Sequence, residues 1–86
     1  MEYSIRYLKN AEKYLDSQPT SVQKRIMDAI DGLPKGDVLK LKGRKGYRLV
    51  VGGFRVLFDY TNKTTSDGKA IIEIVTVGAR GDVYKK

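Results

Sequence analysis

Two arginines, Arg48 and Arg55, flank a Gly-Gly pair at a spacing that would place both on one surface. They belong to YRLVVGGFRVLFDY, residues 47–60, where two runs rich in Val, Leu, Phe and Tyr surround Gly52 and Gly53. A Gly pair supplies the positive φ angles of a two-residue turn, so the stretch predicts a β-hairpin. Guanidinium groups on an open sheet face can hold phosphate oxygens in bidentate pairs.

The predicted hairpin has one apolar face and one mixed face. With Gly52-Gly53 as the turn, Arg48 lies opposite Leu57, and side chains alternate between the two faces. The first face should pack on a core because all its members are apolar or aromatic: Tyr47, Leu49, Val51, Phe54, Val56, Phe58 and Tyr60. The second carries Arg48, Val50, Arg55, Leu57 and Asp59. The hairpin by itself favours the alternative that the arginines only face solvent, as most charged residues do.

The composition limits the chemistry that this chain can perform. Its 86 residues predict one domain, residues 1–86. Cysteine and histidine are both absent, which removes disulfides, thiolate metal sites, the usual general base at neutral pH and the commonest metal ligand. We expect no metal and no cofactor. The apolar runs are shorter than a membrane span and no signal pattern precedes them, so we expect a cytoplasmic protein.

The positive charge of the chain predicts a polyanionic partner. The net charge is +7, which suits nucleic acid, an acidic protein or an anionic membrane, and the membrane is the weakest candidate because no basic amphipathic helix stands out. Residues 35–46 read as an extended basic loop that continues the surface of Arg48, although a solvated loop without a specific role is the alternative. Its cations are Lys35, Lys40, Lys42, Arg44 and Lys45, against Asp37 alone.

The remaining elements predict an α+β domain. Alternation over residues 1–7 predicts a strand, and apolar spacing predicts helices over residues 9–17 and 20–33, the second with Thr20 as its N-cap and Gln23 completing a capping box. Residues 38–41 within the basic loop could form a further short strand, and the sequence does not decide between strand and loop there. The apolar run 70–77 predicts an interior strand buried on both faces. The order β-α-α-β-β-β gives a helical hairpin packed on one face of a four-stranded, mainly antiparallel sheet.

Four segments together resemble a known group of proteins. Leu41-Lys42-Gly43, Tyr47-Arg48-Leu49, GGFRVLF (52–58) and VGARGDVY (77–84) strongly resemble the RelE/ParE toxin superfamily in order and spacing. The N-terminal strand and the helical hairpin fit as well, so the resemblance covers nearly the whole chain. Within that superfamily the chain is most similar to the RelE type, since Arg80 and Tyr84 in the last segment favour the RNase branch.

The resemblance implies a function. RelE-like proteins are toxins of type II toxin–antitoxin systems that cleave mRNA in the ribosomal A site without a metal and so inhibit translation. A cognate RelB-like antitoxin neutralises them by wrapping around them, and contact with operator DNA would come only through that antitoxin. The alternatives are a ParE-like inhibitor of DNA gyrase and a catalytically weak relative that still binds an antitoxin.

The resemblance also implies roles for individual residues. Arg55 would stabilise the phosphate charge, and Arg80 would assist it or act as general acid. Tyr84 would stack on the nucleotide, orient it or help to activate the 2′-OH. Arg48 would contact phosphate, and the neighbouring cations of the loop would bind RNA: Lys42, Arg44 and Lys45.

One position departs from the RelE pattern and leaves the general base open. RelE proper tends to carry a second lysine on the arginine face, where this chain has Val50. Lys42 or Lys45 could supply an amine from the loop, and Glu73 is a weaker alternative. Neighbouring cations lower the pKa of a lysine or a tyrosine, which would help either group to lose a proton.

Overall fold

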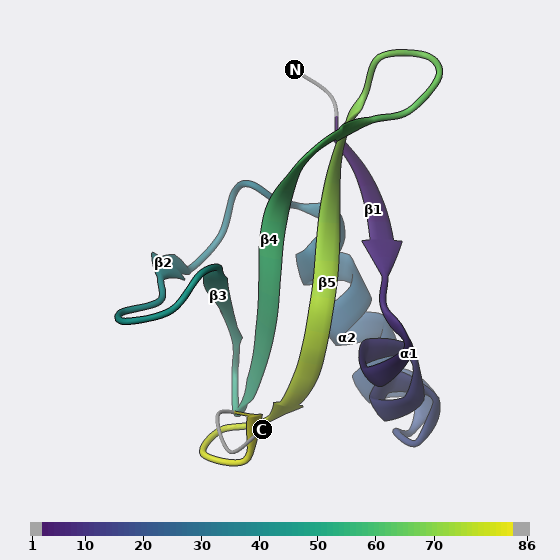
Figure 1. The fold of residues 1–86 in the computed structure, drawn as a ribbon. Coiled ribbons are helices and arrows are strands. Elements are labelled where there is room, and N and C mark those ends of the chain that lie inside the picture. The colour runs from purple at the N-terminus through teal and green to yellow at the C-terminus, as the bar shows by residue number, and fades with distance from the viewer. Residues whose placement is uncertain (1–2, 84–86) are drawn as a thin grey trace.

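The computed structural model describes residues 3–83 of the chain. These residues form two helices and five strands (Figure 1). In chain order the elements are β1 (Tyr3–Tyr7), α1 (Lys9–Asp16), α2 (Thr20–Asp31), β2 (Val38–Lys40), β3 (Tyr47–Val51), β4 (Phe54–Thr64) and β5 (Ala70–Ala79). Neither helix is long and apolar enough to cross a membrane.

The strands form one mixed sheet in the order β1-β5-β4-β3-β2. All neighbours are antiparallel except β1, which pairs with β5 in parallel. The α+β prediction is confirmed, but the expected count of four strands is wrong. The fifth strand, β2, spans three residues that pair with β3. A segment this short shows no period-2 pattern from which a strand could be asserted.

The β3–β4 hairpin has the predicted register. Val51 pairs with Phe54 and Arg48 pairs with Leu57. Gly52 has a φ of 57°, a left-handed conformation that a glycine adopts without steric cost. The two-residue turn therefore fixes which side chains face the helices.

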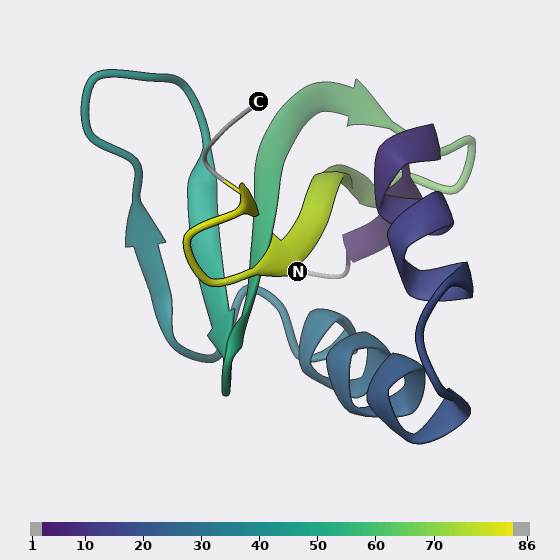
Figure 2. The ribbon, with the colours of Figure 1, turned by 90° about the horizontal axis from the view of Figure 1, so that it is seen from below.

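Both helices pack on the same side of the sheet (Figure 2). The apolar stripe of α1 packs mainly over β5, and that of α2 packs over the hairpin strand β3. Burying one such side chain contributes about 1.5 to 3 kcal/mol. The core residues are Ala11 and Leu15 of α1, Ile26 and Ile30 of α2, Leu33, Leu49, Val51, Val56, Phe58, Ile72, Ile74 and Val77. Within residues 3–83, no helix lies over the opposite side of the sheet (Figure 2).

The start of α2 differs from the prediction. Thr20 is its first helical residue rather than its N-cap, and Pro19 occupies the cap position without a side-chain hydrogen bond. The Pro19 carbonyl accepts the N–H groups of Val22 and Gln23 at 3.0 Å each. The Gln23 side chain donates to the Gln18 carbonyl at 2.9 Å instead of closing a capping box. A proline fits this place because its fixed φ suits the entry to a helix.

Strand β5 is interior to the sheet, as predicted, but it is not buried on both faces. Ile72 and Ile74 are fully buried, whereas Glu73 is half-buried and Val75 is 40% exposed. The pairing shifts register at this point, since Leu57 pairs with Thr76 and Phe58 with Ile74. Val75 is the extra residue of this bulge, and a bulge turns one side chain out of the regular alternation.

Candidate nucleic-acid interface

Arg55 lies at the hairpin-turn end of β4, on the sheet face opposite the helices. It pairs with Val50 on β3 and with Gly78 on β5. Because paired residues share a face, Arg55 has a short alkyl side chain on one side and no side chain on the other. The Val50 side chain is short, so a substrate phosphate could approach this guanidinium from the β3 side, whereas Val83 packs over Gly78 on the β5 side.

The Arg55 guanidinium is folded back toward the hairpin turn. Its Nη1 donates to the carbonyl oxygens of Gly52 and Phe54, each at 2.9 Å. Within residues 3–83 no carboxylate pairs with it. Nη1 alone makes these bonds, so Nη2 and Nε keep donors for a ligand, and the two carbonyls fix the position from which they act.

Arg80 lies at the same end of the sheet as Arg55. It follows the last residue of β5, and its backbone N–H donates to the Gly53 carbonyl at 2.9 Å. Its side chain is exposed. The Gly52-Gly53 turn thus anchors both predicted catalytic arginines, one through its side chain and the other through its backbone.

The chain after Arg80 folds back onto β5 beside Arg55. A Cβ placed on Gly78 would lie 3.2 Å from the Cβ of Val83, and Val83 is only 4% exposed. Asp82 N–H donates to the Ala79 carbonyl at 3.0 Å, which tightens this turn. Tyr84, the third predicted catalytic residue, lies outside the described residues, and its role stays a prediction.

The predicted RNA-binding cations separate into two groups. Arg48 lines a shallow hollow of about 370 Å³ together with Lys42, Arg44 and the side chains of residues 39–41. Lys45 instead forms an ion pair with Asp59 at 3.5 Å. An exposed pair of this kind contributes at most about 1 kcal/mol, so it does not lock Lys45 in place. Lys42 and Arg44 extend the surface of Arg48, whereas the charge of Lys45 is balanced.

The half of the open face that is remote from the hairpin turn is charge-balanced. Glu73 pairs with Asp59 across β4 and with Arg6 across β1. With Lys45 beside Asp59, the two neighbouring carboxylates have a cation on each side, Arg6 on β1 and Lys45 in the loop before β3. Glu73 stands five residues before Gly78, a separation of about 15 Å along a strand. That distance is too long for Glu73 to take a proton from a group bound at Arg55.

Several tyrosines pack against the core, among them Tyr47 and Tyr60 of the predicted apolar hairpin face. Burial raises the pKa of Tyr7, and the negative charge of Asp31 raises it further. Burial also raises the pKa of Tyr60, with smaller effects from Tyr3 and Tyr47. These phenols stay neutral on the helix side and are poorly suited to act as a base. The partly buried tyrosines of the core are Tyr3, Tyr7, Tyr14, Tyr47 and Tyr60.

Arg25 of α2 is a residue at the hairpin turn that sequence reasoning did not identify. A Cβ on Gly52 would lie 2.5 Å from its Nη2, so the guanidinium lies directly over the turn. The helical pattern shows only that Arg25 stands outside the apolar stripe. Its contact with a residue 27 positions later depends on how α2 crosses the sheet, which no local spacing reveals.

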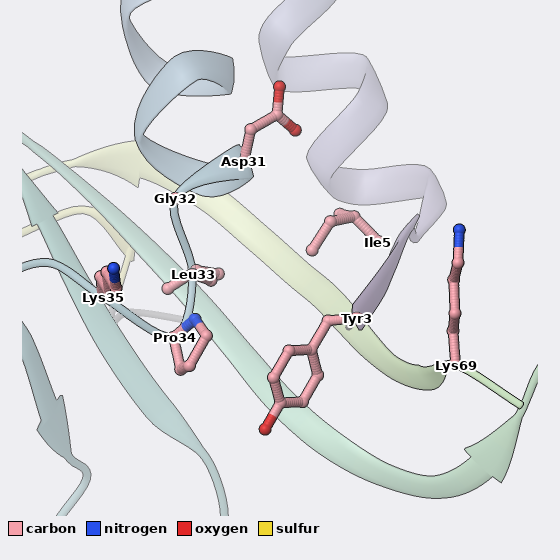
Figure 3. A pocket seen from close by; sticks show the side chains of 8 residues that line it. All are labelled: Tyr3, Ile5, Asp31, Gly32, Leu33, Pro34, Lys35 and Lys69. Atoms are coloured by element: carbon pink, nitrogen blue, oxygen red, sulfur yellow. The ribbon is translucent and has the colours of Figure 1, made fainter. Parts of the chain in front are cut away.

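Another hollow lies at the other end of the molecule. Its volume is about 650 Å³, and Figure 3 shows it between the start of β1 and the end of α2. Lys69, at its edge, immediately precedes β5, whereas Arg80 immediately follows β5. This hollow is therefore separate from the arginines. Its lining residues are Tyr3, Ile5, Asp31, Gly32, Leu33, Pro34, Lys35 and Lys69.

Three solved toxin–antitoxin structures contain a chain of similar fold. The archaeal RelE–RelB complex from Pyrococcus horikoshii OT3 matches with a TM-score of 0.64 and 28% identity, over 96% of this chain and 100% of that one. The RelB–RelE complex from Methanococcus jannaschii matches with a TM-score of 0.61 and 26% identity, over 87% of this chain and 89% of that one. The RelBE2 complex from Mycobacterium tuberculosis matches with a TM-score of 0.66 and 18% identity, over 95% of each chain.

The likeness extends over the whole architecture rather than over one motif. No protein-family model and no curated protein matched the sequence. The three structural matches, in contrast, each include the helical hairpin and the sheet, because they cover 87% or more of this chain. The chain therefore has the RelE-like toxin fold.

Proposed function

We propose that this protein is the toxin of a type II toxin–antitoxin system and that it cleaves mRNA on the ribosome without a metal. The toxin assignment draws support from the fold, which matches chains solved in complexes with RelB antitoxins. The nuclease assignment rests on one observation, the convergence of Arg55 and Arg80 on the Gly52-Gly53 turn at the open face.

In the proposed reaction the substrate supplies its own nucleophile. The 2′-OH loses a proton and attacks the adjacent phosphorus; the new O2′–P bond forms as the P–O5′ bond breaks. The products are a 2′,3′-cyclic phosphate and a 5′-hydroxyl end, once the leaving oxygen has gained a proton. Arg55 would stabilise the charge on the pentacoordinate phosphate, which is the step where fixed donors are most effective.

Arg80 would assist Arg55 or protonate the 5′-oxygen, and Tyr84 would orient the nucleotide or help to activate the 2′-OH. Arg48, Lys42 and Arg44 would hold the flanking strand through its phosphates. The residue that accepts the 2′-OH proton is left unassigned, because Val50 stands directly opposite Arg55.

The proposed partner is a RelB-like antitoxin. Its segments would offer acidic or apolar side chains to the basic face of the toxin, ordering on contact. Neutralisation would follow if such a segment covered Arg55 or Arg80.

Cleavage in a translating extract tests the proposal. We expect Arg55→Ala and Arg80→Ala each to lower the rate of transcript cleavage about 100-fold or more, as loss of one donor to a developing oxyanion does. Mapped transcript ends report the cleavage, and thermal unfolding reports the fold. Arg6→Ala, an exposed arginine on β1, is the matched control and should cleave normally. Unchanged cleavage by both active-site variants would contradict the assigned chemistry.

A second candidate function is that of a catalytically weak relative that binds an antitoxin. Val50 favours it, because an alkyl group stands beside Arg55 where a proton acceptor would be useful. This candidate predicts normal growth after induced expression and tight antitoxin binding. Growth arrest with DNA damage signalling and intact transcripts would instead indicate inhibition of a protein target such as gyrase.

A further inference from the structure

Arg25 reaches the hairpin turn from the side opposite to Arg55. Its Nη2, Cζ and Nη1 atoms lie 2.5, 3.1 and 3.5 Å from the position that a Cβ on Gly52 would take. The guanidinium thus rests on Gly52 in the space that any other residue would fill with its side chain. On the other side of the turn, Arg55 donates to the carbonyl of the same glycine.

The turn therefore contacts three arginines from three elements: Arg25 and Arg55 through their guanidinium groups, and Arg80 through its backbone N–H. Arg25 comes from α2, Arg55 from β4, and Arg80 follows β5. In the described part of the chain none of the three forms an ion pair with a carboxylate. By contrast Lys24, the neighbour of Arg25, pairs with Asp28 at 3.6 Å. Like charges brought together without a counter-charge are unfavourable, and an anion would relieve that repulsion.

The geometry points to Arg25 as a further phosphate-binding residue of the RNA site, which we propose contacts the backbone phosphate next to the scissile one. This inference rests on the proposed nuclease function. If Arg55 and Arg80 hold the scissile phosphate, the strand must continue past the hairpin tip, and Arg25 is the cation on that path. The interface would then extend from the open face around the turn to α2.

RNA suits this arrangement better than an acidic peptide does. The guanidinium groups lie on the two sides of a narrow turn, so no single carboxylate could reach both. A nucleic-acid backbone presents one phosphate after another, and guanidinium forks hold phosphates bidentately. The contact would carry no base preference, because phosphate contacts position the strand and do not read it.

Binding of a 2′-O-methyl oligoribonucleotide, which cannot be cleaved, tests the role of Arg25. We expect Arg25→Gln to weaken binding about threefold to tenfold, as loss of one exposed charge-assisted contact does. From about 50 to about 200 mM salt, the slope of log affinity against log salt should fall in magnitude by about 0.7, the value for one single-strand phosphate. Arg25→Lys should keep the slope but lose part of the affinity.

Lys24→Gln is the matched control, because it removes the same charge from the adjacent exposed position of α2. In the cleavage assay Arg25→Gln should raise KM and leave kcat near normal, because a phosphate remote from the reacting bond is held equally throughout the reaction.

The outcomes separate this inference from the proposed function. If the unaltered protein neither binds RNA nor cleaves transcripts, the proposed function fails. If it does both and Arg25→Gln behaves like Lys24→Gln, the role of Arg25 is wrong and the nuclease proposal stands. Weaker binding of an acidic antitoxin segment with unchanged RNA affinity would also overturn it, because Arg25 would then serve the partner rather than the substrate.

Discussion

At the scale of the residue, two kinds of polar group have opposite surroundings. Arg55 has its Nη1 satisfied by two carbonyls and further donors directed elsewhere. The Tyr7 hydroxyl is buried, and within residues 3–83 it has no hydrogen-bond partner. A buried polar group without a hydrogen-bond partner costs free energy, so the Tyr7 hydroxyl lowers the stability of the fold. The hydrogen bonds of Arg55, in contrast, hold its guanidinium in place.

We therefore expect Tyr7→Phe to leave the free energy of unfolding unchanged or to raise it by up to about 1 kcal/mol. Urea unfolding at neutral pH measures this difference. A lower free energy of unfolding in the Phe variant would show that the Tyr7 hydroxyl makes a stabilising hydrogen bond.

The same substitution should change the alkaline limit of stability. Burial and Asp31 raise the pKa of Tyr7 in the folded protein, so the unfolded chain ionises first. The free energy of unfolding that is linked to this pKa difference is fully present below about pH 10, where Tyr7 is neutral in both states. It is lost as the pH rises through the pKa of Tyr7 in the folded protein. Tyr7→Phe should lose less stability above about pH 10 than the unaltered protein. Equal losses in both proteins would contradict this prediction.

At the scale of the element, β5 and the turn that follows it border Arg55. Gly78→Ala places a methyl group 3.2 Å from the Cβ of Val83, so the returning segment must move. The backbone at Gly78 is not left-handed, and the change in stability should stay below about 1 kcal/mol. Cleavage should fall about tenfold or more, because small misplacements of catalytic groups are costly.

Gly53→Ala is the control for this prediction. No atom lies within 4 Å of a Cβ placed on Gly53, and its φ is not left-handed. It should cleave transcripts normally in the extract. If Gly78→Ala cleaves as well as Gly53→Ala does, the position of the segment after β5 is irrelevant to catalysis.

The hairpin shows what local sequence can predict. Gly52-Gly53 fixes the register, and the register fixes both faces, so the positions of Arg48 and Arg55 follow from a few adjacent residues. Thr20 shows where local reasoning fails, because Pro19 took the cap position that a polar side chain usually holds. Strand β2 is too short to show an alternation of apolar and polar residues, and it forms only by pairing with β3 in the folded protein.

The candidate site was predictable only in part for the same reason. The proximity of Arg55 and Arg80 depends on the β4–β5 pairing, which the resemblance to RelE implied but no spacing requires. Arg25 could not be found, since it meets Gly52 only through the packing of α2 on the sheet. Sequence patterns identify faces, whereas sites that combine several elements need the fold.

At the scale of the whole molecule, one small core supports every element. A domain of this length has an unfolding free energy of roughly 4 to 13 kcal/mol, so a single core residue matters. Ile26 is fully buried between α2 and the sheet. We expect Ile26→Ala to cost about 2 to 5 kcal/mol and to lower Tm by about 10 °C or more.

Met27→Ala is the matched control on the same helix, because Met27 is 39% exposed. It should change the free energy of unfolding by less than about 1 kcal/mol. Calorimetry or thermal unfolding followed by circular dichroism distinguishes the two. Similar losses for both variants would show that α2 is not held by its apolar stripe.

The row of Arg6, Glu73, Asp59 and Lys45 has a consequence for how a polyanion arrives. These two cations and two anions balance at one end of the sheet face that carries no helix, whereas within residues 3–83 Arg55 and Arg80 at the other end form no ion pair with a carboxylate. The electrostatic potential must then rise along the strands toward the hairpin tip. If the ligand is RNA, as proposed, this gradient would turn it before contact, and its orientation would be selected during the encounter itself.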